Sequence, residues 1–594
     1  MKRPAKPIQL SEYRKNYKMK NFFFKAIFYF LIFSLPITYY LLPTNLFAQN
    51  SDDLEITLDV KSNTIALPGI FKPNMDLSGR GSYAQASWPQ TLAAPEVLDT
   101  WQKDIGFNGI FRIQYNLWDI YELAKNKEEQ DRLLANYEEI IKKISDAGGI
   151  VILDIFGTPA GLGKVLDKKS PFYDYRSFKE LVKSHMKNLS CDKRYNLWYE
   201  VWTAPDLDDF FLGRKQEYFN LYKAVAEGAK ELEAETRIHI PVGGPGVSWW
   251  FQNSDGNTIV TPEKSFIYEF IKFCYSSRLP IDFITWHAYS TDGKAEKELT
   301  RYNKTAVPMI RDWLNYFRFD RNTPLIIDEW NYDSGANVLP ARGERAFVSS
   351  SFIVSRIKNM YDAGLDHQVY FSLEDFYSAK DNLVRNTGVF WFDPESQKYK
   401  GGAKSSYNVF RMLAALGNKM FFTLKFDDEF VGVIPTKTTD GVVLMIYNYI
   451  DPALAFNYVS RNIARLNERE KRFILSLIKR DTFDKIMRRE QEVSVLRCSK
   501  KVKTLLQKAQ EIYSRGEKFK TTPRNIKISL KNLKDNYLYQ RYAVDEACSL
   551  NCAFTPAEEK ETTASAEAYQ ESLVLKPYSV NMVVLKKKAA QEAN

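Results

Sequence analysis

Carboxylate and aromatic side chains gather at the ends of a series of short apolar runs in this 594-residue chain. Glu329 ends one such run, Glu374 and Asp375 follow another, and His287 and Tyr289 end a third. Glycosidic bonds are cleaved by a pair of carboxylates, one a nucleophile or base and the other an acid, while aromatic faces hold the sugar rings. The same positions contain no Ser-His-Asp set and no group of histidines, so we expect neither a metal nor a cofactor.

The apolar runs alternate with amphipathic stretches from about residue 55 to residue 415, as parallel strands joined by helices do. Eight such units over this length predict an α/β fold, a (β/α)8 TIM barrel whose active site lies at the C-terminal ends of its strands. A doubly wound sheet is disfavoured, because no glycine-rich phosphate loop follows the first strand. An early strand is expected near 67–74, and the later strands at 109–116, 148–159, 195–202, 237–246, 281–290, 324–332 and 367–375.

The pattern changes after the barrel, where residues 416–455 and 521–590 contain short runs typical of strands. These two ranges predict a C-terminal antiparallel β-sandwich. Residues 456–520, which lie between them, have apolar residues at helical spacing and predict a helical insertion. Residues 555–571 are polar and predict a mobile loop.

The net charge of +10 is concentrated in two segments. Residues 1–48 hold eight Lys/Arg and one Glu, and residues 456–520 hold eighteen Lys/Arg and eight Asp/Glu, so the remainder is mildly acidic. This distribution argues against a nucleic-acid-binding core. The basic insertion is suited to contact with anionic lipid, to binding of an acidic polysaccharide, or to a solvated arm packed on the sandwich.

The N-terminal segment combines this basic charge with an uncharged apolar run of 17 residues, from Ala26 to Leu42. The run is at the short limit for a membrane-spanning helix and is long for a signal peptide, and the basic lead-in keeps the N-terminus in the cytoplasm. We therefore expect an exported protein, periplasmic or extracellular, that is either anchored to the membrane by residues 1–48 or cleaved from them.

Five cysteines are few for a secreted chain of this size, and only Cys548 and Cys552 are close in sequence. Their spacing allows a disulfide that closes a small loop. A zinc site is not supported there, because no histidine is near and four ligands are lacking.

Four segments, in this order and spacing, resemble glycoside hydrolase family 39: "WYEVWTAPDL", "IPVGGPG", "DFITWHAYS" and "LIIDEWNY". That family includes β-xylosidases, α-L-iduronidases and bacterial exopolysaccharide hydrolases. The resemblance covers roughly residues 60–450 and resumes in the C-terminal strands. It implies a (β/α)8 barrel followed by a β-sandwich, a carbohydrate substrate, and a retaining double displacement.

The resemblance assigns roles to individual positions. Glu329 matches the family's nucleophile, His287 matches a residue near the reaction centre, and Arg112 matches an arginine close to the nucleophile. The other expected substrate contacts are Trp202, Thr203, Asp206, Tyr289 and Trp330.

Ala204 stands where the family has its acid/base glutamate, and alanine cannot donate a proton. A retaining enzyme needs an acid about 5–5.5 Å from the nucleophile. Glu200 lies four residues earlier, ~13 Å deeper along the strand at ~3.3 Å per residue, which argues against it. Asp206 lies beyond a proline and would need a rearranged loop. The better candidates for a substitute acid are Glu374 and Asp375, because the eighth strand of a closed barrel neighbours the seventh.

Two functions remain open from the sequence. The first is a glycosidase that cleaves a poly- or oligosaccharide with a relocated acid, or one whose substrate has a leaving group that needs no proton. The second is a barrel that binds glycan without cleaving it, as a part of exopolysaccharide assembly. Glu329 favours the first function, and Ala204 favours the second.

Overall fold

The computed structural model describes the chain from residue 54 to residue 588, with gaps. The expected anchor in residues 1–48 lies outside the described residues, so export and anchoring stay predictions. Within the described part, none of the helices combines the length and the apolar character needed to cross a membrane. The described residues are 54–79, 88–248, 262–289, 295–332, 347–378, 383–393, 398–422, 424, 426–564 and 568–588.

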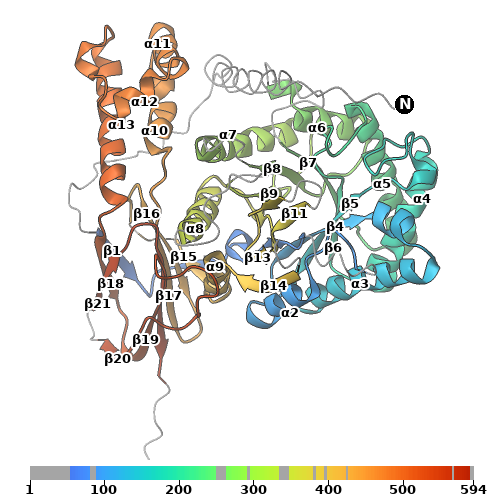
Figure 1. Ribbon diagram of the computed structural model, residues 1–594, viewed down its shortest axis with the longest axis horizontal. Coiled ribbons are helices and arrows are strands. Elements are labelled where there is room, and N and C mark those ends of the chain that lie inside the picture. The colour runs from blue at the N-terminus through green and yellow to red at the C-terminus, as the bar shows by residue number, and fades with distance from the viewer. Residues whose placement is uncertain are drawn as a thin grey trace, which may run out of the picture.

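Eight parallel strands close into a barrel, which confirms the predicted fold class (Figure 1). The seven later strands overlap their predicted ranges, but the first strand, β3 (Met75–Asp76), follows the range 67–74 instead of lying in it. Pro68 and Pro73 account for this difference, since proline cannot donate to a strand ladder and residues 69–71 form a 3₁₀ turn between them. Around the barrel, β3 is followed by β4 (Ile110–Asn116), β5 (Ile150–Phe156), β6 (Leu197–Val201), β7 (Val242–Val247), β8 (Ile284–Ala288), β9 (Leu325–Trp330) and β10 (His367–Tyr370).

Helices surround the barrel and bury one apolar face each. In α3 (Lys127–Asp146), the buried residues Leu133, Tyr137, Ile140 and Ile144 recur at intervals of three or four, as a surface helix requires. The side chain of Asn126 accepts a hydrogen bond from the amide of Glu129 and caps this helix. The other barrel helices are α2 (Pro95–Asp104), α4 (Tyr175–Met186), α5 (Lys215–Thr236), α6 (Phe266–Ser277), α7 (Ala295–Tyr316) and α8 (Phe347–Asp362).

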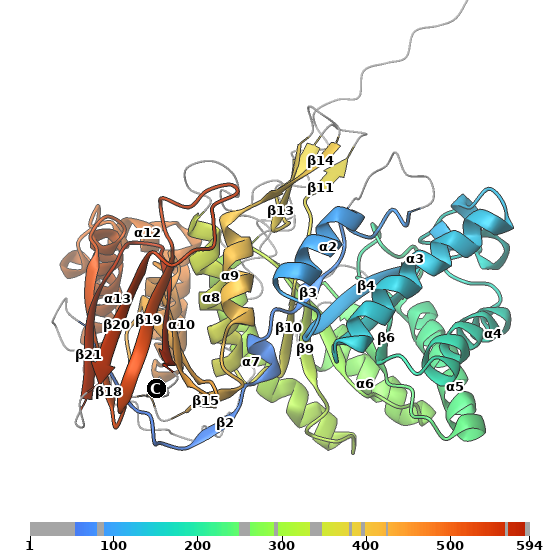
Figure 2. The same ribbon diagram turned by 90° about the horizontal axis from the view of Figure 1, so that it is seen from below.

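Two short hairpins stand above the C-terminal end of the barrel, where the strands end (Figure 2). Both follow β10 in the chain and lead into α9 (Ser405–Ala414). Together, α8 and α9 lie between the barrel and the C-terminal sheets (Figure 2). The hairpins pair β11 (Phe376–Ser378) with β12 (Leu383–Arg385), and β13 (Phe390–Asp393) with β14 (Lys398–Ala403).

A β-sandwich follows the barrel, as predicted, and its two sheets enclose a separate hydrophobic core. The larger sheet has the order β2 (Thr64–Ala66), β15 (Lys419–Phe421), β16 (Val431–Lys437), β17 (Gly441–Asn448), β22 (Val580–Lys587), β19 (Asp535–Val544) and β20 (Glu558–Ala564). The smaller sheet has the order β1 (Leu54–Asp59), β18 (Arg524–Lys531) and β21 (Ala568–Leu575).

Two segments differ from the sequence-based expectations. Residues 54–66 supply β1 and β2 to the sandwich, although the barrel was expected to begin at residue 55, and β1 runs parallel to β18. The expected mobile loop at 555–571 instead contains β20 and the start of β21. Polar composition misled the prediction, because β20 lies at the edge of its sheet, pairs with β19 through its backbone and exposes most of its side chains.

The predicted helical insertion forms an arm between β17 and β18 that extends beyond the sandwich (Figure 1). The arm has a hydrophobic core of its own, which includes Ile474, Ile486, Val502 and Leu506. It consists of α10 (Leu454–Asn462), α11 (Glu468–Lys479), α12 (Thr482–Met487) and α13 (Lys500–Phe519).

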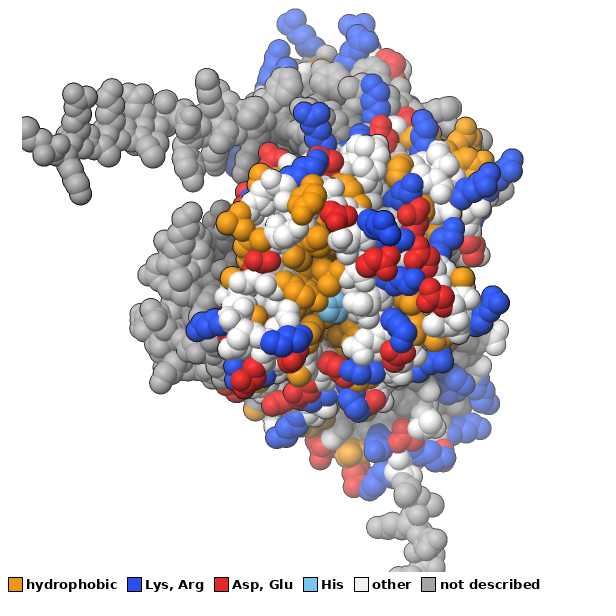
Figure 3. All heavy atoms as spheres, turned by 90° about the vertical axis from the view of Figure 1, so that its right-hand side faces the viewer, with side chains coloured by type: hydrophobic (Ala, Val, Ile, Leu, Met, Phe, Trp, Pro, Cys, Tyr) orange, Lys and Arg blue, Asp and Glu red, His pale blue; other side chains and the backbone are white. Residues whose placement is uncertain are grey.

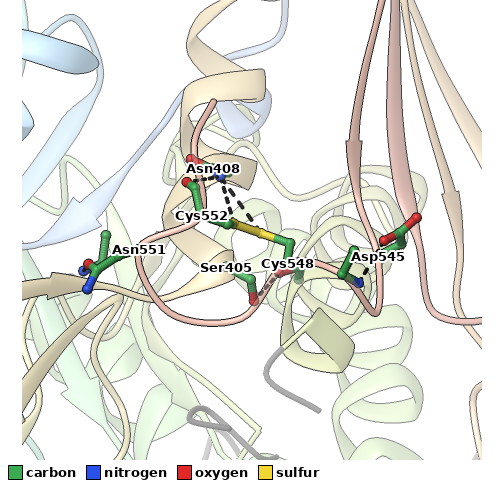
Figure 4. The surroundings of a disulfide bond; sticks show 9 residues. Ser405, Asn408, Asp545, Cys548, Asn551 and Cys552 are labelled. Atoms are coloured by element: carbon green, nitrogen blue, oxygen red, sulfur yellow. Dashed lines mark hydrogen bonds between the residues drawn. A yellow bond between two sulfur atoms is a disulfide. The ribbon is translucent and has the colours of Figure 1, made fainter. Parts of the chain in front are cut away.

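Cys548 and Cys552 form the disulfide that their spacing allowed (Figure 4). The amide of Asn408, on α9, donates a hydrogen bond of 3.1 Å to the carbonyl oxygen of Cys552. In the same loop, the side chain of Asn551 accepts a hydrogen bond of 2.8 Å from the amide of Ala403. The disulfide loop therefore fastens the β19–β20 connection to the end of β14 and to α9.

Replacement of Ile56 tests the contribution of the N-terminal strand to the sandwich. Ile56 is fully buried in the sandwich core, so we expect Ile56→Ala to lower the free energy of unfolding by about 2–5 kcal/mol. Glu55→Ala, at the neighbouring exposed position of β1, is the matched control and should change it by less than about 0.5 kcal/mol. Denaturant unfolding monitored by fluorescence measures both values, and equal effects would show that β1 adds nothing specific to this core.

Candidate active site

The centre of the barrel holds one buried arginine in contact with five carboxylates. Arg112, on β4, is 1% exposed, and its guanidinium reaches acidic residues from four other strands. A single positive charge therefore links β3, β5, β6 and β9 through the barrel interior. The nitrogen–oxygen distances from Arg112 are 3.0 Å to Asp76, 2.9 Å to Asp154, 2.8 Å to Glu200, 3.3 Å to Asp328 and 3.5 Å to Glu329.

A break in the strand register brings two consecutive acids to the same side. Successive residues of a strand normally point to opposite faces, yet both Asp328 and Glu329 lie against Arg112. Between β8 and β9 the pairing moves from Trp286 with Ile327 to His287 with Glu329, so that one extra residue is accommodated on β9. This bulge re-aims Glu329 toward the barrel centre, as bulges beside functional sites do.

The cluster retains protons, because five carboxylates share one arginine in a buried place. Burial raises the pKa of Asp76 to about 6, although Arg112 opposes the shift. Burial also raises the pKa of Asp154 and of Asp328 well above their usual range, with the nearby Glu200 adding to both shifts and Arg112 opposing them. Asp154 and Asp328 therefore hold their protons more strongly than ordinary aspartates do.

Glu329 differs from the other four acids in its exposure. Its side chain is 14% exposed, whereas those of Asp76, Asp154, Glu200 and Asp328 are 0% exposed. The hydroxyl of Tyr289 donates a hydrogen bond of 2.8 Å to Oε1 of Glu329. Burial raises the pKa of Glu329, and both Arg112 and the Tyr289 hydrogen bond act to lower it. Glu329 is thus the acid of the cluster that is open to a ligand.

His287 stands beside this carboxylate as a neutral group. Its Nε2 atom lies 3.3 Å from Oε2 of Glu329, a distance that would suit an ion pair. Burial, together with the positive charge of Arg112, nevertheless lowers the pKa of His287 to about 3. The imidazole therefore contributes a dipole next to Glu329 and adds no charge.

The end of β6 keeps a strained backbone around Ala204. Trp202 and Ala204 both have positive φ angles, 70° and 43°, which cost roughly 1–3 kcal/mol each in residues other than glycine. Ala204 is 2% exposed, and its amide donates a hydrogen bond of 2.8 Å to the carbonyl oxygen of Gly246. Gly246 itself needs to be glycine, because a Cβ atom there would meet the Trp202 carbonyl oxygen at 2.8 Å and φ is +57°.

Asp206 and Thr203 do not supply the missing carboxylate. Asp206 is buried and accepts hydrogen bonds of 2.9 Å from the amide and 2.6 Å from the hydroxyl of Ser248, so it holds the chain after β7. Thr203 is 2% exposed and has a hydroxyl only. The end of β6 therefore has a strained backbone, although residue 204 carries no acidic side chain.

Among the described residues, neither Glu374 nor Asp375 contacts Glu329. Asp375 is buried, forms an ion pair with Lys404 and accepts a 3.0 Å hydrogen bond from the amide of Gly388. Oε2 of Glu374 accepts a 2.9 Å hydrogen bond from the amide of Ala94, at the start of α2. Both acids thus bind the segment after β10 to the start of α2 and to the segment that leads into α9.

Glu200 lies closer to Glu329 than its place in the sequence indicated. The separation of ~13 Å expected from the sequence joins Glu200 to residue 204 along β6, at ~3.3 Å per residue. Glu329, however, lies near Glu200, because both side chains contact Arg112. Glu200 is nevertheless fully buried, so it faces the inside of the cluster and not the open end.

Two tryptophans that were expected to contact substrate belong to the barrel wall. Trp202 and Trp330 are both fully buried. The indole N–H of Trp202 donates to the carbonyl oxygen of Phe210 at 3.1 Å, and that of Trp330 donates to Gln368 at 2.7 Å. Their aromatic faces fill the core, while Arg112, His287 and Tyr289, also predicted substrate contacts, all lie against Glu329.

Sequence reasoning missed three members of the cluster, Asp76, Asp154 and Asp328. A signal existed, because each is a charged residue inside an otherwise apolar run, and a buried charge is more informative than a buried leucine. The contact of all three with one arginine depends on strand tilt and on the bulge in β9, neither of which can be read from residue types.

Exposed hydrophobic side chains lie on the loops that follow β5 and β6. Figure 3 shows hydrophobic side chains gathered near the middle of the barrel face that is turned away from the sandwich, with charged groups around them. Because these loops follow the C-terminal ends of their strands, they form part of the rim of the barrel. The exposed residues on them are Val165, Leu166, Tyr173, Phe210 and Leu212.

Comparisons with known proteins agree with this geometry. The family model described as Glycosyl hydrolases family 39 matches residues 157–479. A β-xylosidase of Geobacillus stearothermophilus is 24% identical over 306 residues, which are 47% of this chain and 53% of that protein. A β-xylosidase of Caldicellulosiruptor saccharolyticus is 26% identical over 277 residues, 43% of this chain and 49% of that protein. The matched part therefore spans about half the length of these curated relatives.

Solved structures share the fold over nearly the whole chain. The GH39 enzyme from Xanthomonas axonopodis pv. citri superimposes with a TM-score of 0.59 and 14% identity, covering 90% of this chain and 97% of that one. A monomeric β-xylosidase from Caulobacter crescentus CB15 gives a TM-score of 0.59 and 15% identity, covering 90% and 100%. At these identities the likeness concerns the fold alone.

The pH dependence of thermal stability tests the effect of burial on the pKa of Glu374. Burial raises its pKa to about 8, so the folded protein keeps a proton that the unfolded chain releases near pH 4.5. Between these values the carboxyl destabilises the fold increasingly as pH rises, by up to about 1.4 kcal/mol per pH unit. Glu374→Gln cannot ionise, so we expect its thermal midpoint to match the wild type at pH 4 and to exceed it at pH 8. Glu55→Gln, at the exposed position of β1, is the control for a carboxyl that is not buried. A constant difference between Glu374→Gln and the wild type across this range would contradict the shift.

Proposed function

Because the chain belongs to glycosyl hydrolase family 39, we propose that it acts on a glycoside by a retaining double displacement with Glu329 as the nucleophile. The observation that carries this proposal is the setting of Glu329. It is the partly exposed carboxylate of a buried cluster, at the C-terminal end of β9, between the hydroxyl of Tyr289 and the guanidinium of Arg112. That position is the catalytic end of a (β/α)8 barrel.

In the first step, a carboxylate oxygen of Glu329 attacks the anomeric carbon, and the glycosidic bond breaks. The bonding electrons leave with the departing oxygen, and a covalent glycosyl ester of Glu329 forms. In the second step, water attacks the same carbon, the ester bond breaks, one proton of the water passes to solvent, and the carboxylate is regenerated with net retention. Arg112 and Tyr289 hold the carboxylate in one orientation during both steps, which lowers the cost of reaching the transition state.

The electrostatics of the cluster support the ionised form of Glu329. The nucleophile has to be deprotonated, although burial raises its pKa. The more deeply buried Asp154 and Asp328 hold protons more strongly, so these neighbours repel the Glu329 charge less. Arg112 is then left to stabilise the carboxylate that faces the open end. Glu329 therefore meets less repulsion from Asp154 and Asp328 than it would if both were charged.

Ala204 sets the limit of this chemistry. General acid assistance contributes about 10²–10⁴-fold, and neither Ala204 nor its neighbours Thr203 and Asp206 provide it in this structure. Substrates whose leaving groups depart without a proton are then favoured over ordinary glycosides. Ala204 likewise offers no general base to activate water in the second step, so we expect the glycosyl ester to persist.

Ala204 also favours a second function, the binding of glycan without cleavage. A barrel without its acid can bind glycan and release it unchanged, and the exposed hydrophobic side chains on the rim, including Tyr173 and Phe210, suit contact with sugar rings. Turnover distinguishes the two functions, because a binding protein would cleave neither activated nor natural glycosides. The names of the curated relatives make β-xylosides the first substrates to test.

A change at position 204 tests the proposed role of the missing acid. We expect the wild type to hydrolyse dinitrophenyl glycosides and glycosyl fluorides while leaving unactivated oligosaccharides almost intact. Ala204→Glu should raise kcat/KM on the unactivated substrates by about 10²–10⁴-fold. It should also introduce a fall in rate at high pH, where the new acid loses its proton, and the wild-type profile should lack this fall.

Thr203→Glu is the matched control, because it adds the same carboxyl one residue away and should give no rescue. Wild-type activity on unactivated substrates that Ala204→Glu leaves unchanged would mean that another residue supplies the acid. Activity on neither class of substrate, with glycan binding intact, would establish the binding function instead.

A further inference from the structure

The helical arm carries a large excess of positive charge on a body that is otherwise mildly acidic. Residues 454–520 contain eighteen Lys/Arg and eight Asp/Glu. The apolar side chains of α11, among them Ile474, Leu475 and Leu477, are buried in the arm's own core. The charged side chains are therefore left on the outer surface of an element that extends beyond the sandwich (Figure 1).

Exposed basic residues form a continuous stripe on α11 and its flanks. Arg469, Arg472 and Lys479 recur at intervals of three and seven, which places them on one side of the helix and opposite Ile474. From residue 469 to residue 480 the stripe runs about 16 Å at ~1.5 Å per residue. We call the exposed residues Arg465, Arg469, Arg472, Lys479, Arg480 and Lys500 the basic stripe.

The two ends of the stripe belong to one surface. Lys500 begins α13, and the next residue, Lys501, donates a hydrogen bond to the carbonyl oxygen of Arg465. The hydroxyl of Ser499 donates to Glu470 of α11, so the starts of α11 and α13 lie side by side. A polymer that follows α11 would therefore meet Lys500 at the same end.

The basic stripe is not explained by ion pairing within the fold. Among the described residues, no member of the stripe forms a salt bridge, whereas other cations of the arm do. Examples are Arg488 with Glu490 at 2.9 Å and Lys508 with Glu511 at 3.0 Å. At the edge of the stripe, Glu468 is already paired with Lys471.

Folding gains nothing from the placement of two of these cations. Arg469 lies in the first turn of α11 and Lys500 in the first turn of α13, where a positive charge opposes the helix dipole, whereas Lys479 lies in the last turn of α11, where a positive charge is favourable. Arg469 and Arg472, like charges three residues apart, add a small penalty. Charge that destabilises the arm and remains exposed calls for an external partner.

We propose that the basic stripe binds a linear acidic polysaccharide, one that carries carboxylates on its sugar units, and so holds the polymer beside the barrel. The charge of the stripe complements a polyanion. The choice of a glycan as that polyanion rests on the proposed function of the barrel. Binding at the stripe requires no cleavage, and the two ideas can therefore fail separately.

Two other polyanions fit the surface less well. Insertion into an anionic membrane needs an apolar face beside the cations, but the apolar face of α11 is turned into the arm's core. Sequence-independent binding of single-stranded nucleic acid relies on aromatic side chains that stack on bases. Within the described arm the exposed large hydrophobic residue is Val495, and the stripe contains no aromatic residue.

The test measures binding of the full chain to polygalacturonate, with neutral xylan as the reference. We expect binding to polygalacturonate at 50 mM NaCl that weakens at least 10-fold at 300 mM NaCl, because salt screens exposed charges. Arg469→Gln/Arg472→Gln/Lys479→Gln should weaken it at least 10-fold. The matched control, Arg488→Gln/Lys508→Gln/Lys520→Gln, removes the same charge from ion-paired sites and should weaken it less than 3-fold.

Several outcomes would overturn the proposal. They are equal losses in the two triple variants, absence of binding at 50 mM NaCl, or tighter stripe-dependent binding to phosphatidylglycerol vesicles or to RNA. Unchanged thermal midpoints show that the variants are folded. Glu329→Gln should bind polygalacturonate as the wild type does, so a failure of catalysis leaves this test intact, and a failure of binding leaves the catalytic proposal intact.

Discussion

The contact of Arg112 with five buried carboxylates is the constraint on which the barrel interior depends. A cation taken out of water is stable only when paired, and removal of its charge would strand acids from β3, β5, β6 and β9 together. The arginine thus fixes how these strands meet at the centre. It also supplies the positive charge that stabilises the exposed carboxylate of Glu329.

Differences in burial give acids of the same chemical type different pKa values. Desolvation raises the pKa of Asp154 and of Asp328 well above their usual range, while Arg112 and the Tyr289 hydrogen bond act to lower the pKa of Glu329 at the open edge. The end of β6 shows the opposite situation. Its left-handed residues Trp202 and Ala204 retain a costly backbone, although the side chain at 204 carries no acid. The left-handed backbone at the end of β6 is thus present without an acidic side chain at position 204.

The sequence predicted the architecture better than the details of the site. Apolar runs at regular spacing placed seven barrel strands and the helical arm, because burial of each strand leaves a direct mark on composition. The role proposed for Glu329 rests on its match to the family's motif at the end of a predicted strand. The residue types do not reveal the bulge that turns Asp328 and Glu329 to the same side. They also do not reveal the contact of Glu200 with Arg112 across the barrel. The edge strand β20 was hidden because its ladder uses backbone groups only.

Covalent trapping of the intermediate tests the central claim most directly. A 2-deoxy-2-fluoro glycoside with a dinitrophenyl leaving group forms the glycosyl ester but hydrolyses it slowly, and peptide mass spectrometry then locates the added sugar. The account predicts one label, on Glu329, and none on the Glu329→Gln variant. A label on another carboxylate, such as Asp328, or hydrolysis of the parent glycoside without any trapped ester, would contradict it.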